Sequence, residues 1–218
     1  MRARMAVVLA GALAALTLVS PAVAAPTTAS TGTPSAGALA GVRQRAVITF
    51  DKNWVDPSDS LLTWKVIRQG ADRRWHIVER FSWRAGSGVL GRAGRNECAK
   101  SRGWLPNGTY QLRYYRDYPG TLIKGRAFRL DDHRCRSGRR TRVQLFIHTE
   151  QGAGNVQCPD VPGDQLCRWE FPEVNDYTSA GCIKLSPDDL AALSERYLAF
   201  FRAGVRYPES RVVLRVVP

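Results

Sequence analysis

Short apolar or alternating segments, separated by turn residues, run through most of the 218-residue chain. Gly70-Ala71-Asp72 and Pro106-Asn107-Gly108 are two such turns, and the first joins segments that we expect to form a hairpin. Many short strands with little helix are typical of a β-sandwich or a barrel, so we predict a mainly β fold in a single domain. The expected strands are 46–50, 60–68, 75–83, 109–114, 127–130, 143–147 and 211–217.

One segment near the C-terminus has helical spacing. Ser186 is a favoured N-cap residue, and Pro187 suits the first helical position because the N–H that it lacks has no partner there. Leu190 and Leu193 then lie on one apolar face. We therefore expect one α-helix in the C-terminal region, with Gly204 as its terminator.

The N-terminus has the three parts of a secretory signal peptide. Arg2 and Arg4 are its positive segment, residues 5–19 are almost wholly apolar, and Ala22-Val23-Ala24 has the pattern of a cleavage site. The apolar segment is short for a membrane span, so we expect a secreted protein with no stable membrane span after cleavage; an uncleaved N-terminal anchor is the alternative. The predicted parts are a signal peptide at 1–24, a flexible linker rich in Ala, Thr, Ser, Pro and Gly at 25–42, and the folded domain at 43–218.

Export implies an oxidising compartment in which cysteines form disulfides, and the chain has five of them, an odd number. Cys158 and Cys167 enclose a short segment with two prolines and a glycine, which favours a disulfide between them. Cys98 and Cys135 are then the second pair by elimination, although the sequence alone does not fix the connectivity. Cys182 remains as the free thiol. Paired C-x-x-C spacings are missing, so we expect no metal.

The chain is strongly basic. Without Arg2 and Arg4 it keeps 30 Lys and Arg against 19 Asp and Glu, a net charge of +11. In an exported protein this charge favours anionic cell-wall polymers or acidic lipids as partners, and no nucleic-acid-binding motif accompanies it. The densest cluster of basic residues consists of Arg134, Arg136, Arg139, Arg140 and Arg142. The alternative interpretation of this cluster is a solvated loop without a specific anionic partner.

The segment Ser179-Ala180-Gly181-Cys182-Ile183-Lys184-Leu185 places the free thiol directly after a glycine, in a short loop before an apolar strand. Glycine allows a backbone conformation that other residues resist, so the thiol can be presented at the tip of a turn. His148, at the end of a predicted strand, can take its proton. The two residues are therefore a candidate nucleophile and base. A structural histidine and a buried, inert cysteine are the alternatives.

These residues resemble the L,D-transpeptidase catalytic domain of bacterial peptidoglycan enzymes, the YkuD-like family. That family has a strand-end His, a loop, and then Ser-His-Gly-Cys followed by an apolar residue and Arg or Asn. Ile147-His148-Thr149 and the segment 179–185 match this pattern, and the turn at 105–110 is similar as well. The resemblance covers roughly residues 47–217. It implies peptidoglycan stem peptides as substrates, and a chemistry that needs no metal or organic cofactor.

The resemblance also implies a role for each residue of the motif. Cys182 is the nucleophile, His148 is the general base and acid, and the backbone carbonyl of Thr149 orients the His148 ring. The backbone N–H groups of Gly181 and Cys182 are expected to form the oxyanion hole. The residues expected to contact substrate are Ser179, Ala180, Lys184 and Tyr177.

The motif departs from the family at two positions. Ala180 stands where a second His is usual, and Lys184 replaces Arg or Asn. The segment 150–178 is longer than in most members, so we expect a lid or a specificity loop there. A cross-linking transpeptidase, an L,D-carboxypeptidase and a non-catalytic basic wall-binding module all remain open. Sortase-like enzymes need a Thr-Leu-x-Thr-Cys strand, and papain-like peptidases place the His after the Cys, so neither class fits.

Overall fold

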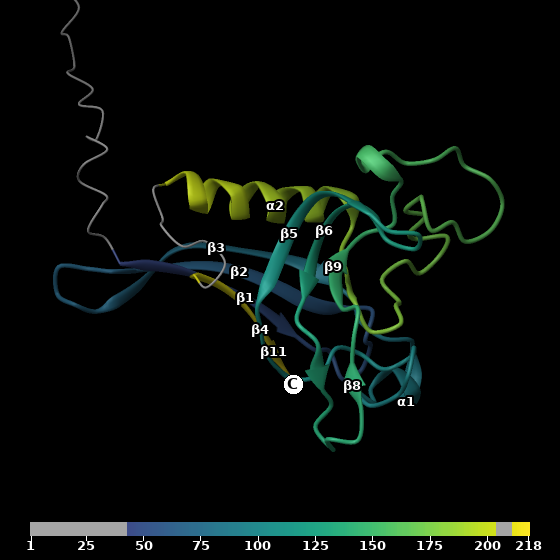
Figure 1. Ribbon diagram of the computed structural model, residues 1–218, viewed down its shortest axis with the longest axis horizontal. Coiled ribbons are helices and arrows are strands. Elements are labelled where there is room, and N and C mark those ends of the chain that lie inside the picture. The colour runs from purple at the N-terminus through teal and green to yellow at the C-terminus, as the bar shows by residue number, and fades with distance from the viewer. Residues whose placement is uncertain (1–42, 204–210) are drawn as a thin grey trace, which may run out of the picture. The chain divides into compact units, whose positions relative to one another are not determined.

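The computed structural model describes residues 43–203 and 211–218. They form a mainly β structure with one long helix, as the sequence predicts (Figure 1). The expected signal peptide at 1–24, the expected linker at 25–42 and Gly204, the expected end of the helix, lie outside the described residues. Within the described part of the chain, no helix has the length and apolar character that a bilayer span needs.

The first sheet contains β1 (Gln44–Asp51), β2 (Ser60–Gln69), β3 (Trp75–Ala85), β4 (Gly108–Tyr110) and β11 (Val212–Val217). Its strand order is β3-β2-β1-β11-β4, and β11 lies parallel to β1. The register places Ile48 opposite Leu214, and both side chains are fully buried. Buried residues alternate with partly or fully exposed ones along β1, because successive side chains of a strand point to opposite faces.

The second sheet contains β5 (Leu112–Pro119), β6 (Lys124–Leu130), β9 (Phe146–His148) and β10 (Ile183–Lys184). Its order is β10-β9-β6-β5, in which β9 and β10 are parallel and the other neighbours are antiparallel. A parallel pair needs a long connection, and residues 149–182 supply it. This connection begins with a short 3₁₀-helix, η2 (Ala153–Asn155), and α1 (Gly91–Gly94) is another short turn.

The long helix α2 (Pro187–Arg202) packs against both sheets. Ser186 caps it by accepting a hydrogen bond from the Asp189 N–H at 3.2 Å. On its inner face, Phe200 makes an edge-to-face contact with Trp64 of β2, and Tyr197 makes one with Phe128 of β6. The helix therefore joins the two sheets into one hydrophobic core, in a sandwich-like packing.

Two expected strands differ from the structure. The segment 109–114 divides at Gln111, because β4 pairs with β11 in the first sheet whereas β5 pairs with β6 in the second. The segment 143–147 becomes regular only at Phe146, since Gln144 adopts a left-handed conformation with φ of 55°. Just before it, a small antiparallel sheet is formed by β7 (His133–Arg134) and β8 (Thr141–Arg142).

Candidate active site around Cys182

The pairing of β9 with β10 brings the segment that carries Cys182 beside the strand that ends at His148. Lys184 lies directly opposite His148 in the register. Cys182 lies in the bend that immediately precedes β10, two residues before Lys184. Both Cys182 and His148 line one cavity of about 900 Å³. The structure thus places the expected nucleophile and the expected base in a common site.

The imidazole of His148 is buried and held in one orientation. Its Nδ1 lies 3.0 Å from the backbone carbonyl oxygen of Thr149. A carbonyl only accepts hydrogen bonds, so Nδ1 carries the proton and Nε2 is left as the basic nitrogen. Burial, followed by the positive charge of Lys184, lowers the pKa of His148 to about 4. The ring is therefore neutral at pH 7 and able to accept a proton.

The thiol of Cys182 is also neutral at pH 7. Burial raises its pKa to about 11, although the Phe146 N–H and the charges of Arg142 and Lys184 act in the opposite direction. Its sulfur lies 3.7 Å from the carbonyl oxygen of Gln144. The resting pair is therefore thiol and imidazole, and a thiolate forms only when the proton is transferred.

This resting state predicts the pH dependence of Cys182 alkylation. The rate of reaction with iodoacetamide should rise steadily from pH 7 to pH 10, because the thiolate fraction grows until the pH reaches a pKa of about 11. The other four cysteines are in disulfides, so intact mass reports on Cys182 alone. If the alkylation rate did not change between pH 7 and pH 10, the resting state would instead be a thiolate–imidazolium pair.

The hydroxyl of Ser179 fixes the loop that carries the thiol. It donates to the Cys182 carbonyl at 2.7 Å and accepts from the N–H groups of Gly88 and Gly181, each at 3.0 Å. Although Ser179 lines the cavity, this hydroxyl is fully engaged, so we assign it to the loop and not to substrate binding.

The same contact corrects the expected oxyanion hole. Because the Gly181 N–H donates to Ser179, it is not free to bind an oxyanion. The Cys182 N–H donates to no described residue and remains available. Gly181 is instead required by the backbone conformation and the packing at this position. Its φ is +123°, and a Cβ there would collide with the guanidinium of Arg142.

Arg142 organises the site although the sequence places it only in a basic cluster. Its guanidinium is buried and donates to four backbone carbonyls, those of Glu97, Trp104, Gly103 and Ala180. The bond to Ala180 is 2.7 Å long and gives the loop a second hydrogen-bonded support besides Ser179. Ala180 itself is exposed at the cavity wall, where it was expected.

Lys184 lines the cavity, but its ammonium group has an internal partner. It forms an ion pair with Glu150, and the two side chains are only 11% and 4% exposed. Burial raises the pKa of Glu150 to about 7, and Lys184 opposes this rise. The expected contact between Lys184 and a substrate carboxylate would therefore have to compete with Glu150.

Tyr177 is not part of this cavity, so its expected contact with substrate is not supported. Its buried ring makes edge contacts with Trp169 and Phe171, and the Arg84 guanidinium lies 4.3 Å from its centre. Tyr177 therefore anchors the connection to β3. From the connection between β9 and β10, Glu150 and Leu166 reach the cavity wall.

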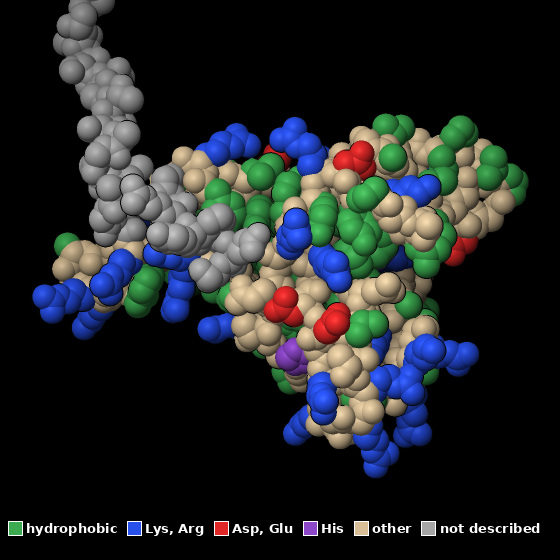
Figure 2. All heavy atoms as spheres, viewed as in Figure 1, with side chains coloured by type: hydrophobic (Ala, Val, Ile, Leu, Met, Phe, Trp, Pro, Cys, Tyr) green, Lys and Arg blue, Asp and Glu red, His purple; other side chains and the backbone are tan. Residues whose placement is uncertain are grey.

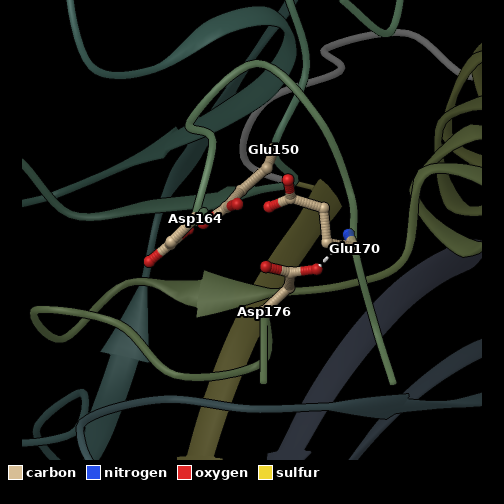
Figure 3. A group of neighbouring side chains, drawn as sticks. All are labelled: Glu150, Asp164, Glu170 and Asp176. Carbon is tan, nitrogen blue, oxygen red and sulfur yellow. Dashed lines mark hydrogen bonds between the residues drawn. The ribbon is translucent and has the colours of Figure 1, made fainter. Parts of the chain in front are cut away.

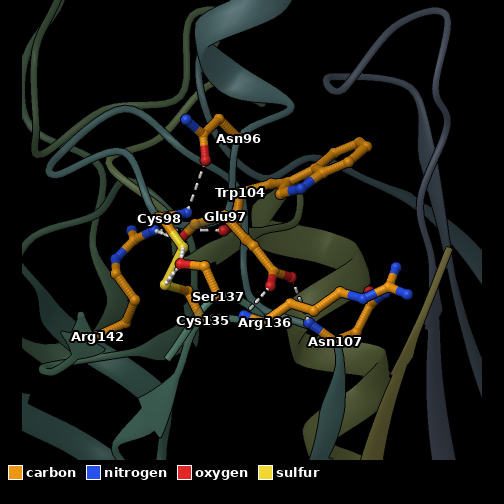
Figure 4. The surroundings of a disulfide bond; sticks show 9 residues. All are labelled: Asn96, Glu97, Cys98, Trp104, Asn107, Cys135, Arg136, Ser137 and Arg142. Carbon is orange, nitrogen blue, oxygen red and sulfur yellow. Dashed lines mark hydrogen bonds between the residues drawn. A yellow bond between two sulfur atoms is a disulfide. The ribbon is translucent and has the colours of Figure 1, made fainter. Parts of the chain in front are cut away.

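Both expected disulfides are present, Cys98–Cys135 and Cys158–Cys167. Figure 4 shows the first one beside Glu97, whose carbonyl accepts from Arg142 and whose carboxylate accepts from the Arg136 and Asn107 N–H groups. This disulfide ties the α1 region to the β7–β8 hairpin and so surrounds Arg142 with its acceptors.

No family model matches the chain, and no curated protein matches it. A similar solved structure is that of the helical cell shape determining protein Pgp2 from Campylobacter jejuni, with 17% sequence identity and a TM-score of 0.43. The match covers 79% of this chain and 47% of that one, so this chain spans about half the length of that protein. We base no argument on a likeness this distant.

Proposed function

We propose that the protein is an exported cysteine acyltransferase that acts on peptidoglycan stem peptides, an L,D-transpeptidase. The observation that carries this proposal is that the Cys182 thiol, just before β10, and the His148 imidazole, at the end of the adjacent strand β9, line one cavity. The Thr149 carbonyl adds support, because it fixes the tautomer that leaves Nε2 basic. We infer the substrate class, peptidoglycan stem peptides, from the resemblance of the motif at 179–185 to that of the L,D-transpeptidases.

In the first half of the reaction, Nε2 of His148 takes the thiol proton and the Cys182 sulfur attacks the carbonyl carbon that precedes the terminal D-residue. The N–H of Cys182 donates to the oxyanion that forms. The C–N bond then breaks, and His148 returns the proton to the leaving amine. The products are a thioester on Cys182 and a free D-amino acid, and His148 is neutral again.

In the second half, the amine of another stem peptide attacks the thioester. Its proton passes to His148, the C–S bond breaks, and the proton moves to the Cys182 sulfur. A new amide cross-link is formed and the enzyme returns to its starting state. If water attacks instead of the amine, the same site acts as an L,D-carboxypeptidase.

A basic end of the molecule suits an anionic wall polymer. Figure 2 shows Lys and Arg side chains gathered over the β7–β8 hairpin. Four of the five clustered arginines are exposed there, whereas Arg142 is buried. Arg140 and Lys100 also line the Cys182 cavity, so the positive charge extends to its wall. The exposed arginines are Arg134, Arg136, Arg139 and Arg140.

Intact-mass spectrometry with a tetrapeptide stem tests the proposed reaction. The wild type should gain the mass of the stem without its terminal D-residue, and the adduct should disappear when an acceptor amine is added. Cys182→Ala should gain nothing, because the other cysteines are in disulfides. Release of the D-residue with water alone would favour the carboxypeptidase. An equal result for wild type and Cys182→Ala would exclude catalysis by this thiol.

A further inference from the structure

Four carboxylates converge beside the candidate active site, in a place where the sequence shows no metal-binding motif. Figure 3 shows Glu150, Asp164, Glu170 and Asp176 pointing toward one another. One ligand oxygen from each lies within 4.8 Å of the other three. Oxygens on opposite sides of a Ca²⁺ ion, bound at 2.3–2.6 Å, are about 4.6–5.2 Å apart, so this spacing is that of a calcium ligand set.

Two of these carboxylates are deeply buried and incompletely satisfied. Glu150 is 3% exposed and Asp176 is 2% exposed. Within the described residues, no group donates a hydrogen bond to Oε2 of Glu150 or to Oδ1 of Asp176. Buried anionic oxygens without partners are costly, because they have lost their water without gaining a donor or a cation.

The other oxygens of the cluster have donors that fix its geometry. Oδ2 of Asp176 accepts from the N–H groups of Glu170 and Phe171, which turns Oδ1 toward the other carboxylates. Both oxygens of Glu170 accept from Gln165, at 2.7 and 2.9 Å. Lys184 pairs with Oε1 of Glu150 and is the one cation in an ion pair with the cluster among the described residues. The carboxyl groups of Asp164, Glu170 and Asp176 are therefore left without a cationic partner among the described residues.

We propose that these four residues bind one hard divalent cation, of which Ca²⁺ fits best. Carboxylate oxygens are the ligands that Ca²⁺ prefers, and it accepts the irregular arrangements that loops provide, whereas Mg²⁺ demands a small octahedral shell. Asp164 is exposed and gives the ion and its waters a route from solvent. The site differs from the thiol–imidazole pair, and no step of the proposed reaction passes through it.

The cation would fasten the connection between β9 and β10. Asp164, Glu170 and Asp176 belong to the middle and end of this connection, whereas Glu150 follows His148 by two residues. Binding would therefore join the loop that contributes Leu166 to the cavity wall with the backbone that carries the base. We expect the cation to order the loop and to protect it from proteolysis.

Calorimetry and terbium luminescence on the metal-stripped protein at pH 7.5 test the site. Ca²⁺ should bind with a 1:1 stoichiometry and a Kd on the order of 10⁻⁴–10⁻³ M, as in extracellular calcium modules. Asp164→Asn and Asp176→Asn should each weaken binding by about tenfold or more. Ca²⁺ should also slow the cleavage of the connection by a protease and raise the melting temperature of the wild type.

Glu173→Gln is the matched control, because Glu173 is an exposed carboxylate of the same connection and lies outside the cluster. It should bind Ca²⁺ like the wild type, and so should Cys182→Ala, which separates this proposal from the catalytic one. Asp164→Asn removes an exposed group, so it remains informative if Asp176→Asn does not fold. The absence of saturable binding by the wild type, or equal binding by wild type and Asp164→Asn, would overturn the proposal.

Discussion

Replacement of His148 by Gln is expected to slow the acylation of Cys182 by about 10²- to 10⁴-fold at pH 7. The thiol has a pKa of about 11, so only about one molecule in 10⁴ carries a thiolate at neutral pH without a base. Gln fills a similar volume, and its amide can donate to the Thr149 carbonyl that now holds Nδ1. Stopped-flow or quenched mass spectrometry of the acyl-enzyme measures the rate.

Two comparisons make this result specific. His76→Gln should react like the wild type, because His76 is an exposed residue of β3 that pairs with Asp72. The defect of His148→Gln should also shrink as the pH is raised toward 11, since the thiolate then forms without help. Equal acylation rates for wild type and His148→Gln at pH 7 would contradict the assignment of His148 as the base.

Arg142→Met is expected to lower the free energy of unfolding by about 4 kcal/mol or more, because it removes the buried donor of four hydrogen bonds. The substitution leaves four carbonyls without their donor, and each unpaired buried group costs about 1–3 kcal/mol. It also releases Ala180, so acylation of Cys182 should slow in the fraction that remains folded. The urea concentration at half-unfolding measures the change.

Arg140→Met is the control for this substitution, because Arg140 comes from the same hairpin but is exposed. Its effect should stay within about 0.5 kcal/mol. Arg142→Lys should recover only part of the loss, since one ammonium group cannot reach carbonyls that the planar guanidinium now spans. Similar unfolding midpoints for Arg142→Met and Arg140→Met would show that the guanidinium does not hold the loop.

The parts of the fold that local patterns encode could be predicted from the sequence. The hairpin of β2 and β3 follows from alternation and a turn, and α2 begins where Ser186 and Pro187 indicate. The division at Gln111 could not be predicted, because both halves have the same strand pattern and differ only in the partner strand. Partner choice depends on residues far away in the chain.

The candidate site, too, could be predicted from the sequence only in part. The order of His148 and the Cys182 motif predicted which residues share the cavity, and the Thr149 carbonyl lies where it was expected. The burial of Arg142 and of Tyr177 could not be predicted, because a charged residue in a basic run and an aromatic residue near the motif give no sign of burial. Those environments arise from tertiary packing.

The acidic cluster of Glu150, Asp164, Glu170 and Asp176 could not be predicted from the sequence either. Its members are separated by 14, 6 and 6 residues, which matches no regular period of a helix or strand. The conformation of the loop alone brings the four carboxylates together, and this conformation cannot be predicted from the composition of the chain.

The parallel pairing of β9 with β10 has a consequence for how such a protein can diversify. Any crossover that is long enough for a parallel connection delivers Ile183 to Ile147 in the same register, provided that it returns to the same edge of the sheet. His148 and Cys182 lie at the two ends of the crossover, so changes confined to its middle, residues 150–178, leave them in place but alter the wall that the crossover presents to a substrate. Exchange of residues 150–178 between related proteins should therefore change substrate selectivity while the proposed nucleophile and base are kept.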